Sequence, residues 1–290
     1  MATTEIDQLV TPGSGRGLLD VYRDRFLLKL LVRKEIKVRY RGSVLGLLWS
    51  YVKPLIQFLI YFVALGIFLN LQRGTPNYAI YLFAGIVLVN FFTESLSNAT
   101  RSIVDNRDLI RKIYLPRELF PVATVWVSAA HFLPQLVVLV GACLIVGWTP
   151  SVLQLAAFFL VFLIVAVLAT GLGLLFGAMN VYFRDSENIV DMIVMVVTWA
   201  SPVLYIWSMV EQVMGPWYWI YQLNPMTVAV EVFHWVFWEP TLKTDQYVTG
   251  TMPPELLTLW LPVSIGITLV VLFIGQLTFR RLAVHFAQEL

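Results

Sequence analysis

The chain has 290 residues, of which 59% are hydrophobic and only 13% are charged. About a quarter of the residues of a soluble domain are charged, so this composition excludes an ordinary soluble globular protein. The formal net charge of +2 is too small to indicate a nucleic acid or an acidic polymer as partner. We expect one all-helical membrane domain, with lipid as part of its solvent.

The first 42 residues precede this domain and differ from it in character. Residues 1–17 are small, polar and rich in glycine, and they contain no early apolar run of the kind found in a cleaved signal peptide. We expect a flexible cytoplasmic tail. Residues 18–42 hold eight basic residues among leucines, which predicts an amphipathic helix at the membrane interface. Residues 36–41 also alternate as a strand would, but an edge strand beside a bilayer leaves its backbone groups unpaired.

The transmembrane domain is expected over residues 43–290. The apolar runs predict six spanning helices, at about 44–69, 78–96, 119–146, 152–179, 189–206 and 256–278. A further apolar segment at 207–238 is broken by Gly215, Pro216, Asn224 and Pro225. It predicts two half-length re-entrant helices in the outer leaflet rather than a spanning pair.

Basic residues predict the orientation. Of the 20 Lys and Arg residues, 17 fall in the N-terminal region, the second and fourth loops and the C-terminus, whereas Arg73 and Lys243 fall on the opposite side and Lys53 is unassigned. Because positive charge collects on the cytoplasmic side, both termini are expected in the cytoplasm.

No catalytic or metal-binding residue is predicted. The sequence has no phosphate-binding loop of the P-loop type, and His131, His234 and His285 lack metal-ligand spacing. The only cysteine, Cys143, is expected to be a core residue. The run GLGLLFG at 171–177 has Phe176 in place of the third glycine of a dinucleotide fingerprint. Close helix packing at Gly173 and Gly177 is the better interpretation.

Ionisable and aromatic residues within the apolar runs have two interpretations. Lys53, Glu94 and Asp191 either reach water near the cytoplasmic side or serve function, and Glu94 lies deepest. The aromatic residues either face lipid and the core or line a sugar pathway by ring stacking. With Glu94, the candidate translocation pathway contains Trp49, Tyr51, Tyr61, Tyr81, Phe91, Phe92, Trp199 and Tyr205.

The loop after the second run has helical apolar spacing at Ile103, Leu109, Ile110 and Ile113, with charges between them. It is expected to be a cytoplasmic helix across the membrane end. Such a helix is either an ordinary solvated connector or a docking element for a partner.

Four motifs together resemble one family. They are RYRGSVLGLLWSYVKPL (39–55), LIRKIYLPRELFPV (109–122), YFRD (182–185) and LNPM (223–226). In this order they resemble the permease subunits of ABC-2 type polysaccharide exporters, which handle O-antigen, teichoic acid and related glycans. Among these, the sequence looks most like the exporters of cell-wall galactan in actinobacteria.

This resemblance implies a homodimer in the bacterial cytoplasmic membrane with two copies of a separate P-loop ATPase. That partner uses ATP and Mg, and this chain binds no cofactor. The implied cargo is a polyprenyl-diphosphate-linked glycan. The implied ATPase-coupling residues are Asn106, Arg107, Asp108, Leu109, Ile110 and Arg111. The interface helix could also meet the diphosphate or generic anionic lipid through Arg33, Lys34, Lys37, Arg39 and Arg41.

Two other classes remain open. An exporter of a drug or small lipid would keep the topology and the ATPase. A stand-alone membrane enzyme, such as a lipid-linked glycosyltransferase, would need a clustered acidic or metal-binding site, and the sequence shows none.

Overall fold

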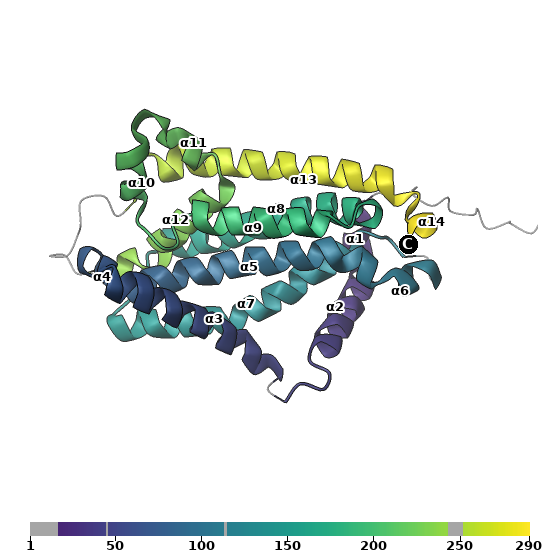
Figure 1. The fold of residues 1–290 in the computed structure, drawn as a ribbon, viewed down its shortest axis with the longest axis horizontal. Helices are drawn as coiled ribbons and strands as arrows, with labels where there is room; N and C mark the ends of the chain where they lie inside the picture. Colours follow the sequence, from purple (N-terminus) through teal and green to yellow (C-terminus); the bar gives the residue numbers. More distant parts are fainter. Residues whose placement is uncertain (1–16, 45, 113–114, 243–251) are drawn as a thin grey trace, which may run out of the picture.

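Long helices run along the length of this molecule (Figure 1). The computed structural model describes residues 17–44, 46–112, 115–242 and 252–290. Within these ranges every regular element is helical, which confirms the predicted all-helical class for the described residues. The predicted tail, at residues 1–17, lies outside them except for Gly17.

Five helices in the described ranges are long and apolar enough to cross a membrane. They are α3 (Trp49–Tyr61) with its π-helical continuation η2 (Phe62–Phe68), α5 (Tyr78–Asp105), α7 (Leu119–Val146), α8 (Val152–Tyr182), and η6 (Leu256–Trp260) with α13 (Leu261–Ala283).

The run predicted as a span at 189–206 forms α9 (Ser186–Ala200), which has 15 residues. At 1.5 Å per residue it is about 22 Å long, shorter than the roughly 30 Å of a bilayer core. The helix ends because Ser201 precedes Pro202 and takes an extended conformation, as residues before proline prefer. Helix length alone therefore supports five spans and not the predicted six.

Shorter helices complete the chain. Before the first span lie α1 (Leu18–Arg23), α2 (Arg25–Arg39) and η1 (Gly46–Leu48). Between the spans lie α4 (Leu71–Gly74), α6 (Arg107–Lys112), α10 (Trp207–Met214), η3 (Gly215–Trp217), α11 (Tyr218–Gln222), α12 (Pro225–Phe237) and η4 (Glu239–Thr241), and α14 (Phe286–Glu289) follows the last.

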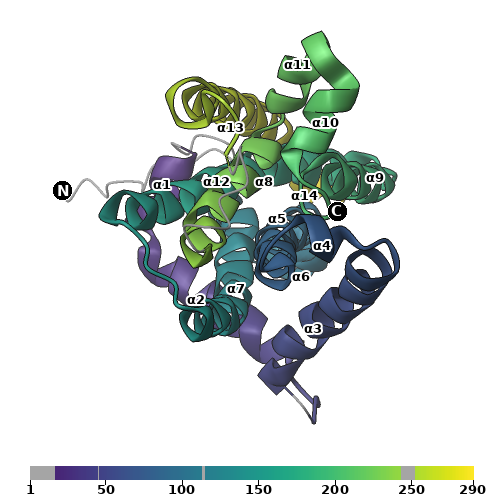
Figure 2. The same cartoon turned by 90° about the vertical axis from the view of Figure 1, so that its left-hand side faces the viewer.

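Helix α5 forms the centre of the bundle. It packs against α7, α8, α9 and α12, which surround it in the end-on view of Figure 2. Of its most apolar stretch, 72% is buried, against 11% for α3 and for α13. The core is therefore built around α5, whereas few residues of α3 and α13 are fully buried.

Glycines allow the closest helix contacts. A Cβ atom added to Gly275 of α13 would lie 2.0 Å from the carbonyl oxygen of Gly171 in α8, and one added to Gly173 would lie 2.4 Å from the Cβ of Ala99 in α5. At Gly177 the added atom would lie 3.0 Å from the carbonyl oxygen of Ala99. The predicted close packing at Gly173 and Gly177 is confirmed, since only small residues let helix backbones approach this far.

Candidate functional site

The two ends of the bundle differ. Helices α6 and α14 lie at one end, and α4, α10 and α11 lie at the other (Figure 1). We call them the α6 end and the α10 end. An apolar cluster holds the α6 end together, with Leu31 of α2, Ile110 of α6 and Phe279 of α13 among its buried members.

Two amphipathic helices, α2 and α6, contribute to the α6 end. In α2, Leu31 is buried, whereas the basic side chains that the sequence singles out are exposed, namely Arg33, Lys34, Lys37 and Arg39. Arg41, just past the helix, is exposed as well. In α6, Ile110 is buried and Leu109 is partly buried, whereas Arg107, Asp108 and Arg111 face outward. The predicted short helix after the second span is confirmed at Arg107–Lys112; Ile113 lies outside the described residues.

Asn106 connects these two helices. It follows the last residue of α5, is 6% exposed, and donates from Nδ2 to the carbonyl oxygen of Ser102 at 2.9 Å. Its Oδ1 accepts a hydrogen bond from Lys34 of α2. The turn that carries α6 is thereby joined directly to α2.

A polar cavity of about 680 Å³ opens between the end of α2 and helices α3, α5 and α7. Its walls are formed by Arg39, Tyr40, Ser43, Trp49, Ser50, Lys53, Pro54, Gln57, Asn90, Thr93, Glu94, Ser97, His131 and Gln135. This volume is typical of a small-molecule site. Twelve of these fourteen residues carry hydroxyl, amide, imidazole or charged groups, but carbon atoms form most of the exposed wall, so the cavity suits a ligand with both polar and apolar parts.

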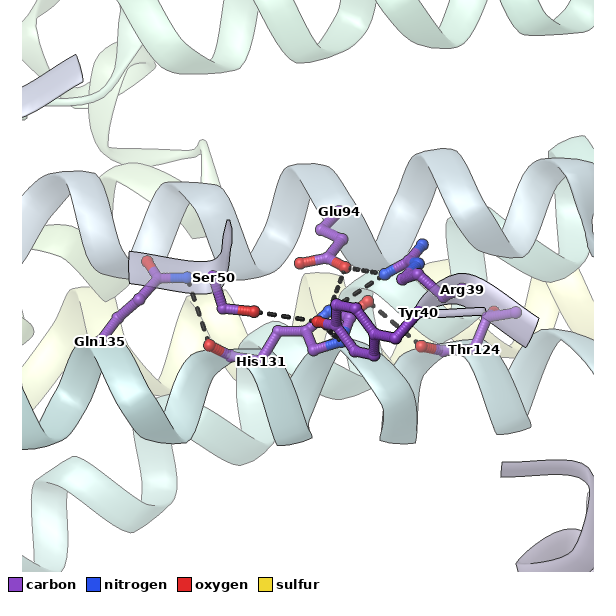
Figure 3. A network of polar contacts seen from close by, with 8 residues as sticks. Arg39, Tyr40, Ser50, Glu94, Thr124, His131 and Gln135 are labelled. Atoms are coloured by element: carbon purple, nitrogen blue, oxygen red, sulfur yellow. Dashed lines mark hydrogen bonds and ion pairs between the residues drawn. The ribbon is translucent and has the colours of Figure 1, made fainter. Parts of the chain in front are cut away.

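A chain of polar contacts crosses the cavity wall and joins four segments (Figure 3). The Arg39 guanidinium pairs with Glu94 of α5, and His131 Nδ1 of α7 lies 2.6 Å from the same carboxylate oxygen. On the other side of the ring, His131 Nε2 lies 2.8 Å from the Tyr40 hydroxyl, which lies 3.1 Å from Ser50 Oγ of α3. The end of α2 is therefore fastened to three spanning helices.

Glu94 sets the direction of its contact with His131. A carboxylate only accepts, so Nδ1 carries a proton toward Glu94, and Nε2 shares a hydrogen bond with the Tyr40 hydroxyl. Arg39 Nη1 also lies 3.0 Å from His131 Nδ1. Since both nitrogens donate to Glu94, this short distance reflects their shared acceptor and is not a hydrogen bond between them. The result is one carboxylate oxygen shared by a guanidinium and an imidazole.

Helix geometry explains why Glu94 and His131 meet. Glu94 lies 11 residues before Asp105, the last residue of α5, and His131 lies 12 residues after Leu119, the first of α7. At 1.5 Å per residue these positions are about 17 and 18 Å from the α6 end of two antiparallel neighbours. The spacing of the histidines alone suggested no role for His131, and the matched depth of the two positions is the sequence signal that pairs it with Glu94.

The three ionisable residues singled out in the apolar runs lie in different places. Glu94 and Lys53 line the cavity, whereas Asp191 is an exposed residue of α9. Lys53 makes no ion pair with the described residues, so the cavity carries two cations, Arg39 and Lys53, against one carboxylate.

The predicted pathway aromatics do not form one group. Tyr81, Phe91 and Phe92 are buried in the core of this single chain, and Tyr61 packs against that core. The remaining four are Trp49, Tyr51, Trp199 and the partly buried Tyr205, the first three of which are exposed. Of the eight aromatic residues, only Trp49 lines the cavity.

A second buried carboxyl group lies at the α10 end. Glu231 of α12 is 4% exposed and accepts hydrogen bonds from Gln222 Nε2 at 3.1 and 3.3 Å and from the Tyr218 hydroxyl at 3.5 Å. Burial raises its pKa to about 8, because desolvation disfavours the charged form. These contacts fasten α11 to α12. The described residues contain no group of three or more His, Cys, Asp or Glu side chains that could hold a metal ion.

Comparison with known proteins gives the family. The model of the family described as "ABC-2 type transporter" matches residues 26–238. The O-antigen export system permease protein RfbA of Klebsiella pneumoniae is 29% identical over 264 residues, which cover 91% of this chain and 95% of that protein. A protein of the same name from Myxococcus xanthus is 28% identical over 246 residues, covering 85% and 93%.

A more distant relative handles another glycan. The capsule polysaccharide export inner-membrane protein CtrC of Neisseria meningitidis is 24% identical over 176 residues, which cover 57% of this chain and 66% of that protein. The family model covers well over half of the chain, including the cavity, α6 and all but the first residue of α2. This chain therefore belongs to the ABC-2 type transporter family.

Proposed function

We propose that this chain is the permease subunit of an ATP-driven exporter, and that it moves a polyprenyl-diphosphate-linked polysaccharide from the cytoplasmic to the outer side of the bacterial cytoplasmic membrane. The relatives named for O-antigen and capsule export support this cargo class. The observation that carries the proposal is a cavity lined mainly by residues with polar or charged side chains in an otherwise apolar bundle, since hydroxyl, amide and cationic groups suit a glycan joined to phosphate.

In this proposal the α6 end faces the cytoplasm. The positive-inside rule supports that orientation, because 17 of the 20 basic residues of the chain lie in segments assigned to that side. Helix α9 then counts as the sixth span together with the extended residues that follow it, and both termini are cytoplasmic. The broken helices α10, α11 and α12 act as re-entrant helices near the outer exit.

The transporter is proposed to be a homodimer that meets along α3 and α9. Figure 2 shows these helices on one flank of the bundle, and both expose large apolar side chains. The exposed residues are Leu55, Ile56, Leu59 and Ile60 on α3, and Met192, Met195, Val196 and Trp199 on α9. Lipid alone could cover them, but two copies would enclose a path next to the exposed aromatic residues Trp49, Tyr51 and Trp199.

Two copies of a separate P-loop ATPase are proposed to dock at the α6 end and to use ATP and Mg there. The outward charges of α6 and the exposed basic face of α2 suit such a partner. Residues 106–111 would then transmit ATP-driven closure to the permease. Asn106 supports this role, because its contact with Lys34 connects α6 to α2.

The test is depletion of the chain in its own cell. Lipid-linked glycan is expected to build up in the cytoplasmic leaflet, and a P-loop ATPase should co-purify in mild detergent. Sugar analysis of the accumulated lipid identifies the glycan; galactose as its main sugar would support a cell-wall galactan. Loss of efflux of an apolar compound without glycan-lipid accumulation would instead favour a drug or small-lipid exporter.

A further inference from the structure

The cavity beside Arg39 contains the cationic groups of an anion-binding site, and one of these cations is already paired with a carboxylate. Arg39 and Lys53 supply two positive charges, and Glu94 supplies one negative charge to Arg39. At 16 residues from Tyr78, Glu94 lies about 24 Å along α5 from the α10 end. With Tyr78 taken as the outer boundary of a bilayer core about 30 Å thick, Glu94 lies roughly 6 Å from the inner boundary, within reach of a lipid headgroup.

Only one of the basic residues considered for diphosphate contact lines this cavity. Arg33, Lys37 and Arg41 are exposed and absent from its walls. Lys34 is engaged by Asn106 and Glu35. Arg39 is therefore the residue of the interface helix that could meet a ligand inside the bundle.

The geometry of Arg39 leaves capacity for a ligand. Its contacts with Glu94 and His131 both use Nη1, and its other two nitrogens have no hydrogen-bond partner among the described residues. A guanidinium can donate two parallel hydrogen bonds to a phosphate, which gives Arg an advantage over Lys in phosphate recognition.

A second observation also indicates a ligand. Gln135 is 6% exposed and lines the cavity, yet its Oε1 has no hydrogen-bond partner in the structure. A buried amide oxygen without a partner is costly, and a hydroxyl group of a bound ligand would satisfy it. Gln57 and Asn90 line the same wall and hydrogen-bond to each other at 3.1 Å, and Trp49 offers an aromatic face for a sugar ring.

We propose that this cavity receives the diphosphate of the lipid-linked cargo through Arg39 and Lys53, and that Glu94 is an internal competitor whose negative charge, paired with Arg39 Nη1, opposes diphosphate binding at the other nitrogens of the same guanidinium. The inference rests on the proposed function and deepens it by assigning the entry site. Glu94 also sets specificity, because a ligand must carry enough negative charge to be attracted to Arg39 beside a carboxylate already fixed by His131.

The test measures binding of radiolabelled farnesyl diphosphate to the full-length chain in phosphatidylcholine nanodiscs. Arg39→Ala is expected to weaken binding at least tenfold. Glu94→Gln, which keeps the shape and removes the competing charge, is expected to tighten it at least threefold. Arg41→Ala is the matched control, because this arginine lies two positions further on and outside the cavity; its affinity should stay within twofold of wild type.

Three results would overturn the inference. Glu94→Gln could bind equally or more weakly, or Arg41→Ala could lose as much affinity as Arg39→Ala, which would indicate generic charge attraction. A gain of affinity in Glu94→Gln cannot arise from misfolding, so it stands as evidence even if Arg39→Ala folds poorly. Lastly, farnesyl diphosphate binding could be lost in nanodiscs of phosphatidylglycerol, which would make the cavity a site for anionic membrane lipid. Competition of inorganic pyrophosphate with farnesyl diphosphate would support recognition of the diphosphate.

Depletion separates this inference from the proposed function. If export requires the chain but Glu94→Gln leaves farnesyl diphosphate binding unchanged, only the entry site is wrong. If glycan export continues without the chain, the proposed function fails, whatever the binding experiment shows.

Discussion

The contact between Gly275 of α13 and Gly171 of α8 gives a sharp test of how these helices pack. Replacing Gly275 with alanine puts a methyl carbon 2.0 Å from the Gly171 carbonyl oxygen, whereas real Cβ atoms essentially never lie within 3.0 Å of such an atom. The obstacle is backbone and not a flexible side chain, so the two helices must separate by about 1 Å.

Overpacking of this kind costs about 1–3 kcal/mol. At roughly 2–4 °C per kcal/mol for a chain of this order of size, the apparent melting temperature should fall by about 5 °C. The assay is thermal unfolding in detergent at one fixed scan rate, since membrane proteins often unfold irreversibly.

Gly266 provides the matched control on the same helix. It is exposed, and nothing lies within 4 Å of a Cβ added there. Gly266→Ala should leave the melting temperature unchanged or slightly raised, because alanine is the better helix former. Equal shifts in the two variants, within about one degree, would refute the inferred tight crossing of α8 and α13.

Three further predictions follow from the polar contacts. Because Glu231 has a pKa of about 8 in the folded chain, above its value of roughly 4.3 when unfolded, stability should fall as the pH rises from 5 to 8; Glu231→Gln should flatten that dependence in melting curves, and an unchanged slope would contradict the assignment. The double substitution of Arg107 and Asp108 by alanine should preserve ATP hydrolysis by the complex while reducing glycan export, and wild-type export would exclude a coupling role for these side chains. Tyr40→Phe removes the hydroxyl that joins His131 to α3, at about 1 kcal/mol, so amide hydrogen exchange in residues 25–40 should become faster; unchanged exchange would show that this contact does not hold α2.

The helical elements could be predicted because their signals are local. The span over residues 119–146 is a long, mainly apolar run, and its predicted bounds match α7. The end of α9 was predicted less well, because the apolar run continues beyond Ala200 and hydropathy gives Pro202 no weight as a helix terminator. Hydropathy counts both parts as one span, whereas backbone geometry divides them.

The candidate site could be predicted only in part. Glu94 was recognisable as a carboxyl group deep in an apolar run, but its partners come from α2 and α7. Tyr40 and His131 are 91 residues apart in sequence and make contact only when the helices pack. Pairings at long range depend on helix rotation, which composition and charge do not specify.

The glycine contact between α8 and α13 also has a consequence for biogenesis. Helix α8 ends at Tyr182 and α13 begins at Leu261, so 78 residues must be synthesised before the partner of Gly171 starts to emerge. At roughly 5–20 residues per second this delay is about 4–16 s. During that interval the surface of α8 around Gly171 is exposed to lipid and to quality-control proteases, until α13 packs against it. A premature stop codon upstream of α13 should therefore yield a product that is degraded in the membrane rather than a partly active transporter.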